Sequence, residues 1–281
     1  MYKNFKEFLN EKDSYLRESQ SSGGKYKPKN KRALIKLVKD SSIHLGDIDT
    51  SAITDFSGVF SNSIRKDFSG IGNWDVSNAT DMSAMFLWVE HFNEPLKNWD
   101  VSKVKNMSKM FKGCKSFNQD ISRWNVSKVT NMSEMFSGCR NFNQPLEKWN
   151  VSSVTDMSHM FNSCRDFNKP LNKWNVRNVT NMNAMFTECS DFNQPLDKWD
   201  VSNVTEMRTM FSYTKHFNQP LDKWDVSNVE DLWRIFFNAE AFTQDLSSWL
   251  KKNKNIKFSE MFDAKKYDLY RDKDRKVGVR I

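Results

Sequence analysis

FNQPLEKWNVSSVTDMSHMFNSCRD, residues 142–166, is the stretch that decides the fold, because the chain repeats nearly the same phrase every 25 residues. The period is clearest in tryptophan, which recurs at Trp74, Trp99, Trp124, Trp149, Trp174, Trp199, Trp224 and Trp249. A fixed period of roughly 20 to 50 residues indicates one structural unit stacked on copies of itself. The sequence therefore predicts a solenoid, which offers long exposed faces and seldom a deep catalytic cleft.

The spacing of apolar residues changes within each unit. Within residues 146–151 the apolar side chains fall at i, i+3 and i+5, so that Trp149 and Val151 alternate with polar neighbours, which is typical of a short strand with one inward face. Ser158 is a good helix N-cap, and the apolar residues of 160–167 fall at helical spacing. The proline of Phe-Asn-Gln-Pro then prevents the helix from continuing. Each unit is therefore predicted to contain a strand, a second extended segment over residues 154–157, a two-turn helix and a turn.

These columns resemble the leucine-rich-repeat solenoids of the BspA type. The resemblance is carried by L-x-x-W-x-V-S-x-V-T-x-M-S-x-M-F-x-x-C-x-x-F and spans about residues 47–262. It implies an α/β repeat solenoid, leucine-rich-repeat-like and right-handed, with about eight 25-residue strand–helix coils between N- and C-terminal caps. It also implies a parallel sheet formed by the L-x-x-W-x-V segments on one face, with helices on the other. Members are generally taken to be adhesion or interaction modules without shared catalytic residues.

The periodicity fades at both ends, as the capping units of a solenoid require. We divide the chain into an N-terminal helix with a Ser/Gly linker, an N-terminal cap, the repeats, and a C-terminal cap with a basic tail: residues 1–24, 25–60, 61–249 and 250–281. Within the first cap, residues 31–39 predict a short amphipathic helix that covers the first coil. Because no apolar run has the length of a signal peptide or a membrane span, we expect a cytoplasmic or virion-interior protein without a membrane partner.

A second resemblance concerns Lys3–Glu11, KNFKEFLNE. This stretch is similar to the capsid-targeting peptides of internal head proteins in T4-like phages, which have the pattern K-x-aromatic-x-E-F-aliphatic-x-E. The resemblance implies cleavage after Glu11 or Glu18, packaging in the capsid, and delivery to the host to bind a host factor. An ordinary amphipathic N-terminal helix explains the same residues.

The formal charge of +8 is unevenly distributed. Residues 1–46 and residues 250–281 each carry eleven basic and five acidic side chains, whereas residues 47–249 carry 21 basic and 25 acidic ones. A solenoid that binds nucleic acid is expected to place its positive charge along the stack. Two interpretations stay open: solvated termini, or termini that attach to nucleic acid or to an acidic partner.

One internal column is basic. The position before Trp holds Arg123, Lys148, Lys173, Lys198 and Lys223. In-register strands place such residues about 4.8 Å apart, where like charges repel by roughly 1 kcal/mol per pair even in water. The position after Trp holds Asn or Asp, for example Asn150, Asp200 and Asp225, and we expect these side chains to balance the basic column. This exposed face is a candidate for binding a partner.

The four cysteines, Cys114, Cys139, Cys164 and Cys189, form one inward column. Zinc sites favour closely spaced Cys pairs, which a single-file column does not supply. We therefore expect reduced core thiols, with the paired Met residues as core filler. The Asn of Phe-Asn-Gln-Pro is expected to bond the backbone as a ladder. Neither metal nor cofactor is predicted.

The leading functional hypothesis is a non-enzymatic protein–protein interaction scaffold. The sequence has no Ser/His/Asp set, P-loop, Rossmann glycine motif or clustered carboxylate pair. Residues that vary from coil to coil would then carry specificity, namely His159 and its column, and the aromatic residues Trp88, Tyr213 and Phe237. One alternative is a bacterial surface adhesin-like repeat protein. Another is a nucleic-acid-associated virion protein that uses its basic termini.

Overall fold

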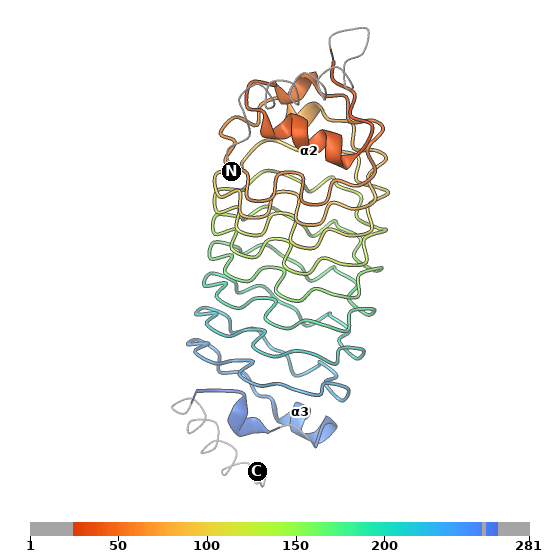
Figure 1. Cartoon of the computed structure of the whole chain (residues 1–281). Coiled ribbons are helices and arrows are strands. Elements are labelled where there is room, and N and C mark those ends of the chain that lie inside the picture. The colour runs from red at the N-terminus through yellow and green to blue at the C-terminus, as the bar shows by residue number, and fades with distance from the viewer. Residues whose placement is uncertain (1–24, 255–256, 264–281) are drawn as a thin grey trace, which may run out of the picture.

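The computed structural model describes residues 25–254 and 257–263, and its coils stack along one axis (Figure 1). Parallel β-bridges link equivalent positions of successive coils: Asp55, Asp81, Asn106, Asn131, Asp156, Asn181, Glu206 and Asp231. The first step is one residue longer than the others, and every later step is 25 residues. The repeats therefore form a solenoid-like stack in which the place of a residue in the unit decides the face on which it lies.

Helices lie only at the two ends of the described chain (Figure 1). They are the α-helices α2 (Lys31–Lys39) and α3 (Ser247–Lys252) and the 3₁₀-helices η1 (Leu45–Asp47), η2 (Ile71–Asn73) and η3 (Phe258–Glu260). From residue 74 to residue 246 the chain forms turns, bends and single bridges.

The helix predicted after Ser158 is wrong, because the segment forms a series of β-turns. Alternate amides close turns within the coil by donating to the carbonyl three residues earlier: Met160, Asn162 and Cys164. The amides between them donate to carbonyls of the next coil at 2.7–3.0 Å: His159, Phe161 and Ser163. An α-helix would use all these amides within its own coil. The turn series instead shares them between the coil and its neighbour.

Two positions in each unit have positive φ. The first column has φ of 52–65° and holds Gly58, Ala84, Lys109, Glu134, His159, Ala184, Thr209 and Arg234. The second has φ of 54–78° and holds Asn62, Trp88, Gly113, Gly138, Ser163, Glu188, Tyr213 and Asn238. A positive φ at the third residue is the requirement of a type II turn, and it costs a non-glycine residue about 1 kcal/mol or more. The hydrogen bonds between coils offset this strain.

The strand predicted over residues 146–151 is also wrong. The amide of Trp149 donates to the carbonyl of Leu146 at 3.0 Å, and the amide of Val154 donates to that of Val151 at 2.9 Å. These two turns occupy amides that a strand would pair with its neighbours. The parallel bridge forms instead at Asp156, within the second extended segment of the predicted unit.

Stacked aromatic rings fill the core. Seven Phe rings, from Phe86 to Phe236, lie 5.6–5.8 Å apart with interplanar angles of 3–10°. A second column, from Phe92 to Phe242, has centroid distances of 5.9–6.0 Å. All eight Trp residues of the repeat are 1–4% exposed. Successive indoles stack at 6.1–6.5 Å between ring centres from Trp99 to Trp149 and from Trp174 to Trp249, which confirms the predicted dry spine over these coils.

Each of these indoles also ties its coil to the preceding one. The Nε1–H of Trp174 donates to the carbonyl of Leu146, 28 residues earlier, at 2.9 Å. All eight Trp residues make the equivalent bond, at 2.8–3.1 Å. The buried indole N–H thus has its acceptor in the preceding coil. The same Trp residue therefore buries apolar surface and fixes the position of its coil relative to that neighbour.

The Asn ladder of the Phe-Asn-Gln-Pro phrase is confirmed, with its partners in the next coil. The Oδ1 of Asn118 accepts from the backbone N–H of Asn143 at 3.0 Å and from the Nε2 of Gln144 at 2.9 Å. The arrangement recurs from Asn93 to Asn218. A polar ladder of this kind fixes the register between coils.

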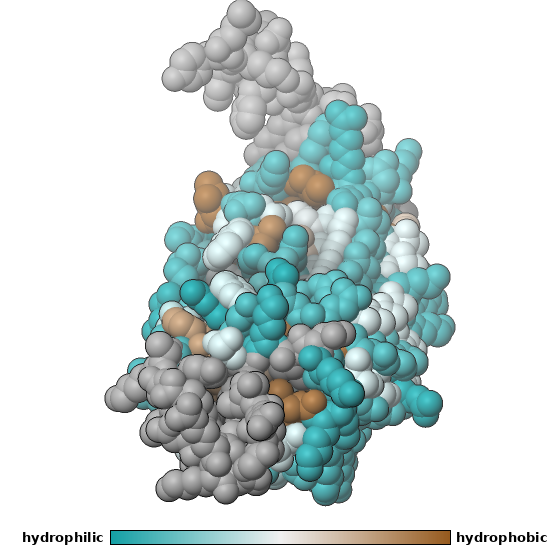
Figure 2. Space-filling view, turned by 90° about the horizontal axis from the view of Figure 1, so that it is seen from below, coloured by the Kyte–Doolittle hydropathy of each residue, from teal (hydrophilic) through white to brown (hydrophobic). Residues whose placement is uncertain are grey.

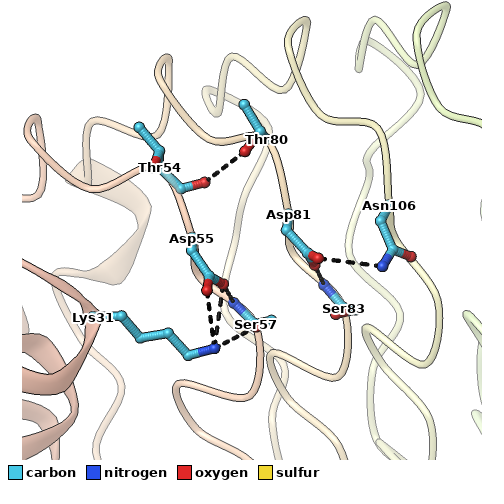
Figure 3. A network of polar contacts seen from close by, with 8 residues as sticks. All are labelled: Lys31, Thr54, Asp55, Ser57, Thr80, Asp81, Ser83 and Asn106. Carbon is cyan, nitrogen blue, oxygen red and sulfur yellow. Dashed lines mark hydrogen bonds and ion pairs between the residues drawn. The ribbon is translucent and has the colours of Figure 1, made fainter.

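The helix predicted for residues 31–39 is confirmed as α2, which caps the first coil. The side chain of Asn30 accepts from the amide of Ala33 at 3.0 Å and so begins the helix. Lys31 bonds both Asp55 and Ser57, at the start of the bridge column (Figure 3). Farther along this column, the Nδ2 of Asn106 donates to Asp81 at 3.3 Å (Figure 3).

Arg65 anchors the other end of α2. Its side chain is 6% exposed, and its guanidinium donates to the carbonyls of Val38, Asp40 and Ile43 at 2.5–3.2 Å. Its Nε donates to the carbonyl of Asp67 at 2.6 Å. A cation at the carboxyl end of a helix also favours the helix dipole. The cap is therefore attached to the first coil by a buried charge that donates to four carbonyls.

The C-terminal end bonds the final coil with a shifted register, because its acceptor carbonyls lie 26 and 25 residues after the donors, where Phe161 and Met185 of the repeats are 24 apart. The amides of Arg234 and Phe236 donate to the carbonyls of Glu260 and Met261 at 2.7 and 3.0 Å. Phe262 stacks on Phe236 at 5.6 Å, and α3 buries Trp249. The last described residues thus cover the final coil.

Candidate functional site

One surface of the stack gathers the outward side chains of the turn series. We call it the turn face, and it consists of residues 83, 84, 87 and 88 and their equivalents every 25 residues up to residues 233, 234, 237 and 238. Contacts between coils join it along its length, from Lys112 beside Trp88 to Tyr213 against Phe237. Both columns of positive φ lie on it. Buried positions repeat from coil to coil, whereas the side chains of the turn face differ.

The structure brings four of the sequence-predicted candidates onto this face: Trp88, His159, Tyr213 and Phe237. Trp88 is 49% exposed, and Gly113 of the next coil lies directly against it. A Cβ on Gly113 would lie 2.2 Å from Cε3 of Trp88. Only glycine permits this approach, so one part of the indole rests on backbone while about half of the side chain meets solvent.

Charged residues follow Trp88 along the face. Lys112 lies 5.8 Å from the centre of the Trp88 ring and bonds Glu134, which also accepts from Lys109 at 3.3 Å. Burial raises the pKa of Glu134, but the hydrogen bond and charge of Lys112, with help from Lys109, lower it below its ordinary value. Glu134 is therefore an ionised link between two cations.

His159 occupies the next coil of the same column. Partial burial among its neighbours lowers the pKa of its imidazole, and the charge of Lys112 lowers it further against the opposing effect of Glu134. The residue as a whole remains exposed. A neutral imidazole at this place offers one donor and one acceptor to a partner.

An exposed cluster ends the turn face at its C-terminal side. We call Tyr213, Trp233, Arg234 and Phe237 the aromatic cluster. The guanidinium of Arg234 lies 4.4 Å from the ring centre of Trp233 and 4.6 Å from that of Phe237. The ring of Tyr213 meets that of Phe237 at 5.6 Å and 65°. Tyr213 and Trp233 are 45% and 41% exposed, so large apolar surface meets water here.

Viewed from the C-terminal end, the visible surface is mainly hydrophilic and apolar residues stand out separately (Figure 2). Arg234 belongs to the variable column of His159 that the sequence analysis singled out, but Trp233 was not among the candidates chosen from the sequence. The signal was present, since residue 233 is Trp where the repeat has Ser, Asn or Arg. Only the fold shows that this Trp lies beside Arg234 and Phe237.

The basic column before Trp lies apart from the turn face. Arg123, Lys148, Lys173, Lys198 and Lys223 are all exposed. The prediction that the Asn or Asp after Trp balances them is wrong. Lys173 and Lys223 pair instead with Glu147 and Asp197, at 3.4 and 3.7 Å. These acids stand two residues before Trp in the preceding coil.

The Asn or Asp after Trp binds its own backbone. The Oδ1 of Asp200 and that of Asn150 each accept from the amide of the Ser two residues later, at 3.1 Å. Asp225 makes the same bond to Ser227. These side chains are therefore committed to local turns, and the second oxygen of Asp200 meets Arg177 at 3.9 Å, not a Lys of the basic column.

The Asp residues that directly follow Trp give a prediction about the stability of the protein in acid. Hydrogen bonds from Ser102, Ser202 and Ser227 lower the pKa of Asp100, Asp200 and Asp225 below 3.8. Because the folded-state pKa is depressed, the stabilisation is present above pH 3.8 and is lost as the pH falls through the folded value. A triple D100N/D200N/D225N variant keeps the turns, as the natural Asn residues do, and should lose less stability in acid.

The measurement is the free energy of urea unfolding between neutral pH and about pH 2. The reverse change N125D/N150D/N175D is the matched control and should steepen the loss. Equal acid slopes for the three proteins would contradict the assignment.

The repeats are recognised by a known family model. Residues 32–131, 119–212 and 167–269 each match the family described as Mycoplasma protein of unknown function, DUF285. The chain belongs to the DUF285 family. The three overlapping matches together extend from residue 32 to residue 269 and so cover the whole stack. No curated protein and no solved structure matches it.

Two predictions made for the N-terminus gain no support from this result. The DUF285 match begins at residue 32, and nothing in it supports a phage capsid-targeting peptide at Lys3–Glu11. The proposed cleavage sites Glu11 and Glu18 lie outside the described residues. In the described part of this DUF285 protein, no helix has the length and apolar character needed to cross a bilayer.

The four cysteines of this DUF285 protein are free and buried, as predicted. Each thiol donates to a carbonyl 28 residues earlier, for example Cys164 to Phe136 at 2.9 Å. Burial raises the pKa of all four thiols, so they are poor nucleophiles. Among the described residues, no three His, Cys, Asp or Glu side chains come together in a way that would hold a metal ion.

Proposed function

We propose that this DUF285 protein is a non-enzymatic scaffold that binds a protein partner through its turn face. The observation that carries the proposal is the contrast between the repeated interior ladders and the varied outward side chains, which include exposed Trp88, Tyr213 and Trp233. Exposed aromatic side chains gathered on one face are typical of interaction sites. The resemblance of the repeat to BspA-type solenoids, whose members are taken to be interaction modules, supports the same proposal.

The aromatic cluster is the proposed centre of the interface. Trp, Tyr and Arg are the residue types that dominate the binding energy of protein interfaces. Arg234 is held between the rings of Trp233 and Phe237, so it loses little side-chain freedom on binding. Its planar guanidinium suits a carboxylate of the partner. The partner is therefore proposed to present an acidic side chain beside an apolar contact.

Site-specific photo-crosslinking in the native host tests the proposal. A photoreactive residue at Tyr213 should give a covalent adduct with a second protein, whereas one at exposed Thr155, outside the turn face, should not. W233A in the Tyr213-labelled protein should weaken binding by about 30-fold or more, which corresponds to about 2 kcal/mol. K148A is the matched control and should leave the adduct unchanged. Equal adducts at Tyr213 and Thr155, or an adduct indifferent to W233A, would contradict the proposal.

A further inference from the structure

The outer surface of α2 forms a basic stripe at the N-terminal end of the stack. Leu34, Leu37 and Val38 are 0%, 0% and 2% exposed, so this side of the helix faces the first coil. The opposite side carries Arg32, Ile35, Lys36 and Lys39, spaced i, i+3, i+4 and i+7. Figure 1 shows that α2 lies across the end of the stack. The stripe is therefore presented outward along the helix.

Ile64 lies on the same end of the molecule and is 92% exposed. Both chain neighbours are fixed, because the amide of Ser63 donates to the carbonyl of Phe60 at 2.9 Å and the buried Arg65 is anchored to four carbonyls. The backbone therefore displays this isoleucine rigidly. Lys39 belongs to the stripe and also lies beside Ile64. These two residues and Lys66, among others, line one hollow of about 670 Å³.

We call Arg32, Ile35, Lys36, Lys39, Ile64 and Lys66 the basic end. A second, shallow hollow of about 540 Å³ runs along α2 and is lined by Arg32, Ile35, Lys36 and Lys39. Residues 25–46 carry seven Lys or Arg side chains and one acidic side chain. Asp67 also lines the larger hollow, beside Lys39, Lys66 and the buried Arg65. The basic end therefore combines positive charge with one protruding aliphatic side chain, that of Ile64, while Ile35 packs partly against the core.

We propose that the basic end binds the surface of an anionic lipid bilayer. Lys and Arg are attracted to anionic headgroups, and aliphatic side chains on a basic amphipathic surface enter the headgroup region. Nucleic acid is less well matched, because single strands are bound by stacking on aromatic rings, and the nearby Tyr26 packs against the core instead. This peripheral contact revises the sequence-based expectation of no membrane partner, which considered only spanning segments.

Cosedimentation of the full chain with lipid vesicles tests the charge requirement. The protein should bind vesicles of phosphatidylcholine mixed with phosphatidylserine, bind pure phosphatidylcholine far less, and dissociate as salt is raised. R32Q/K36Q/K39Q should bind roughly 100-fold more weakly, from about five-fold per charge. K148Q/K173Q/K198Q removes the same charge from the repeats and should bind like the unaltered protein. Equal losses in both variants would overturn the proposal.

Ile64→Asn tests the apolar requirement. Because this side chain is exposed, the change should leave the fold intact while weakening vesicle binding by about ten-fold. Unchanged vesicle binding by this variant would overturn the proposal, as would binding to a DNA oligonucleotide in place of the vesicles. The vesicle assay contains no protein partner, so its outcome is independent of the function proposed for the turn face.

Discussion

Replacing Trp174 with alanine is expected to lower the free energy of unfolding by about 4 kcal/mol. Trp174 is 2% exposed and lies in the middle of the stack, where it contacts Trp199 at 6.4 Å and Phe161 at 6.3 Å between ring centres. The variant loses this burial and leaves the carbonyl of Leu146 without its indole donor. A stack in which each coil contacts only its neighbours has no distant contacts to compensate.

Urea unfolding followed by circular dichroism measures the effect. Trp174→Phe keeps a ring but removes the donor, so it should cost less than alanine, about 1–3 kcal/mol. Lys173→Ala, one residue away and exposed, is the matched surface control and should change stability by less than about 0.5 kcal/mol. A loss below about 1 kcal/mol for the alanine variant would show that the indole spine is not what holds the coils together.

Replacing Arg65 with leucine is expected to cost at least about 3 kcal/mol, because buried carbonyls lose a charged donor. The side chain donates to the carbonyls of Val38, Asp40, Ile43 and Asp67, and leucine can donate to none of them. The effect should be local at first, since these bonds attach α2 and the loops beside it to the first coil.

Amide hydrogen exchange checks this result. The amides of α2 should exchange faster in R65L, while those around Phe161 in the middle of the stack should change little. Arg65→Lys should give an intermediate result, because lysine keeps the charge and loses the planar fork. Arg165→Leu changes an exposed arginine and should match the unaltered protein. Uniform exchange changes over the whole stack would contradict a local attachment role.

The sequence predicted the stacking of this protein better than its local conformation. The columns of Trp, Phe, Asn and Cys determined which residues are buried and which lie 25 apart, and α2 was predicted at its observed bounds. The turn series was missed because Met160, Phe161 and Cys164 fit both a helix and consecutive turns. Neither His159 nor Ser163 is Gly or Asn, so the signal of positive φ lay only in other coils, for example at Gly113 and Gly138 in the column of Ser163 and at Gly58 in that of His159.

The candidate site was predicted in part for the same reason. Trp88, Tyr213 and Phe237 depart visibly from the repeat, so the sequence singled them out. Arg234 could be recognised as part of the aromatic cluster only from its distances to two rings. The balance of the Lys column was misjudged because an Asp or Asn can bind either a neighbour or its own backbone. In this structure Asn150 accepts from the amide of Ser152 in its own turn, and Lys173 pairs with Glu147.

The bond from each indole to the coil before it has a consequence for how such a chain changes length. Trp149 and Trp174 donate to equivalent carbonyls in equivalent surroundings. Deleting one whole repeat would therefore bring together two coils whose contact surfaces already match. The length of the stack would thus be set by the number of repeats in the gene, with a step of about 4.8 Å per coil. Recombination between repeats would then change the distance between the two end caps without altering the structure of either cap.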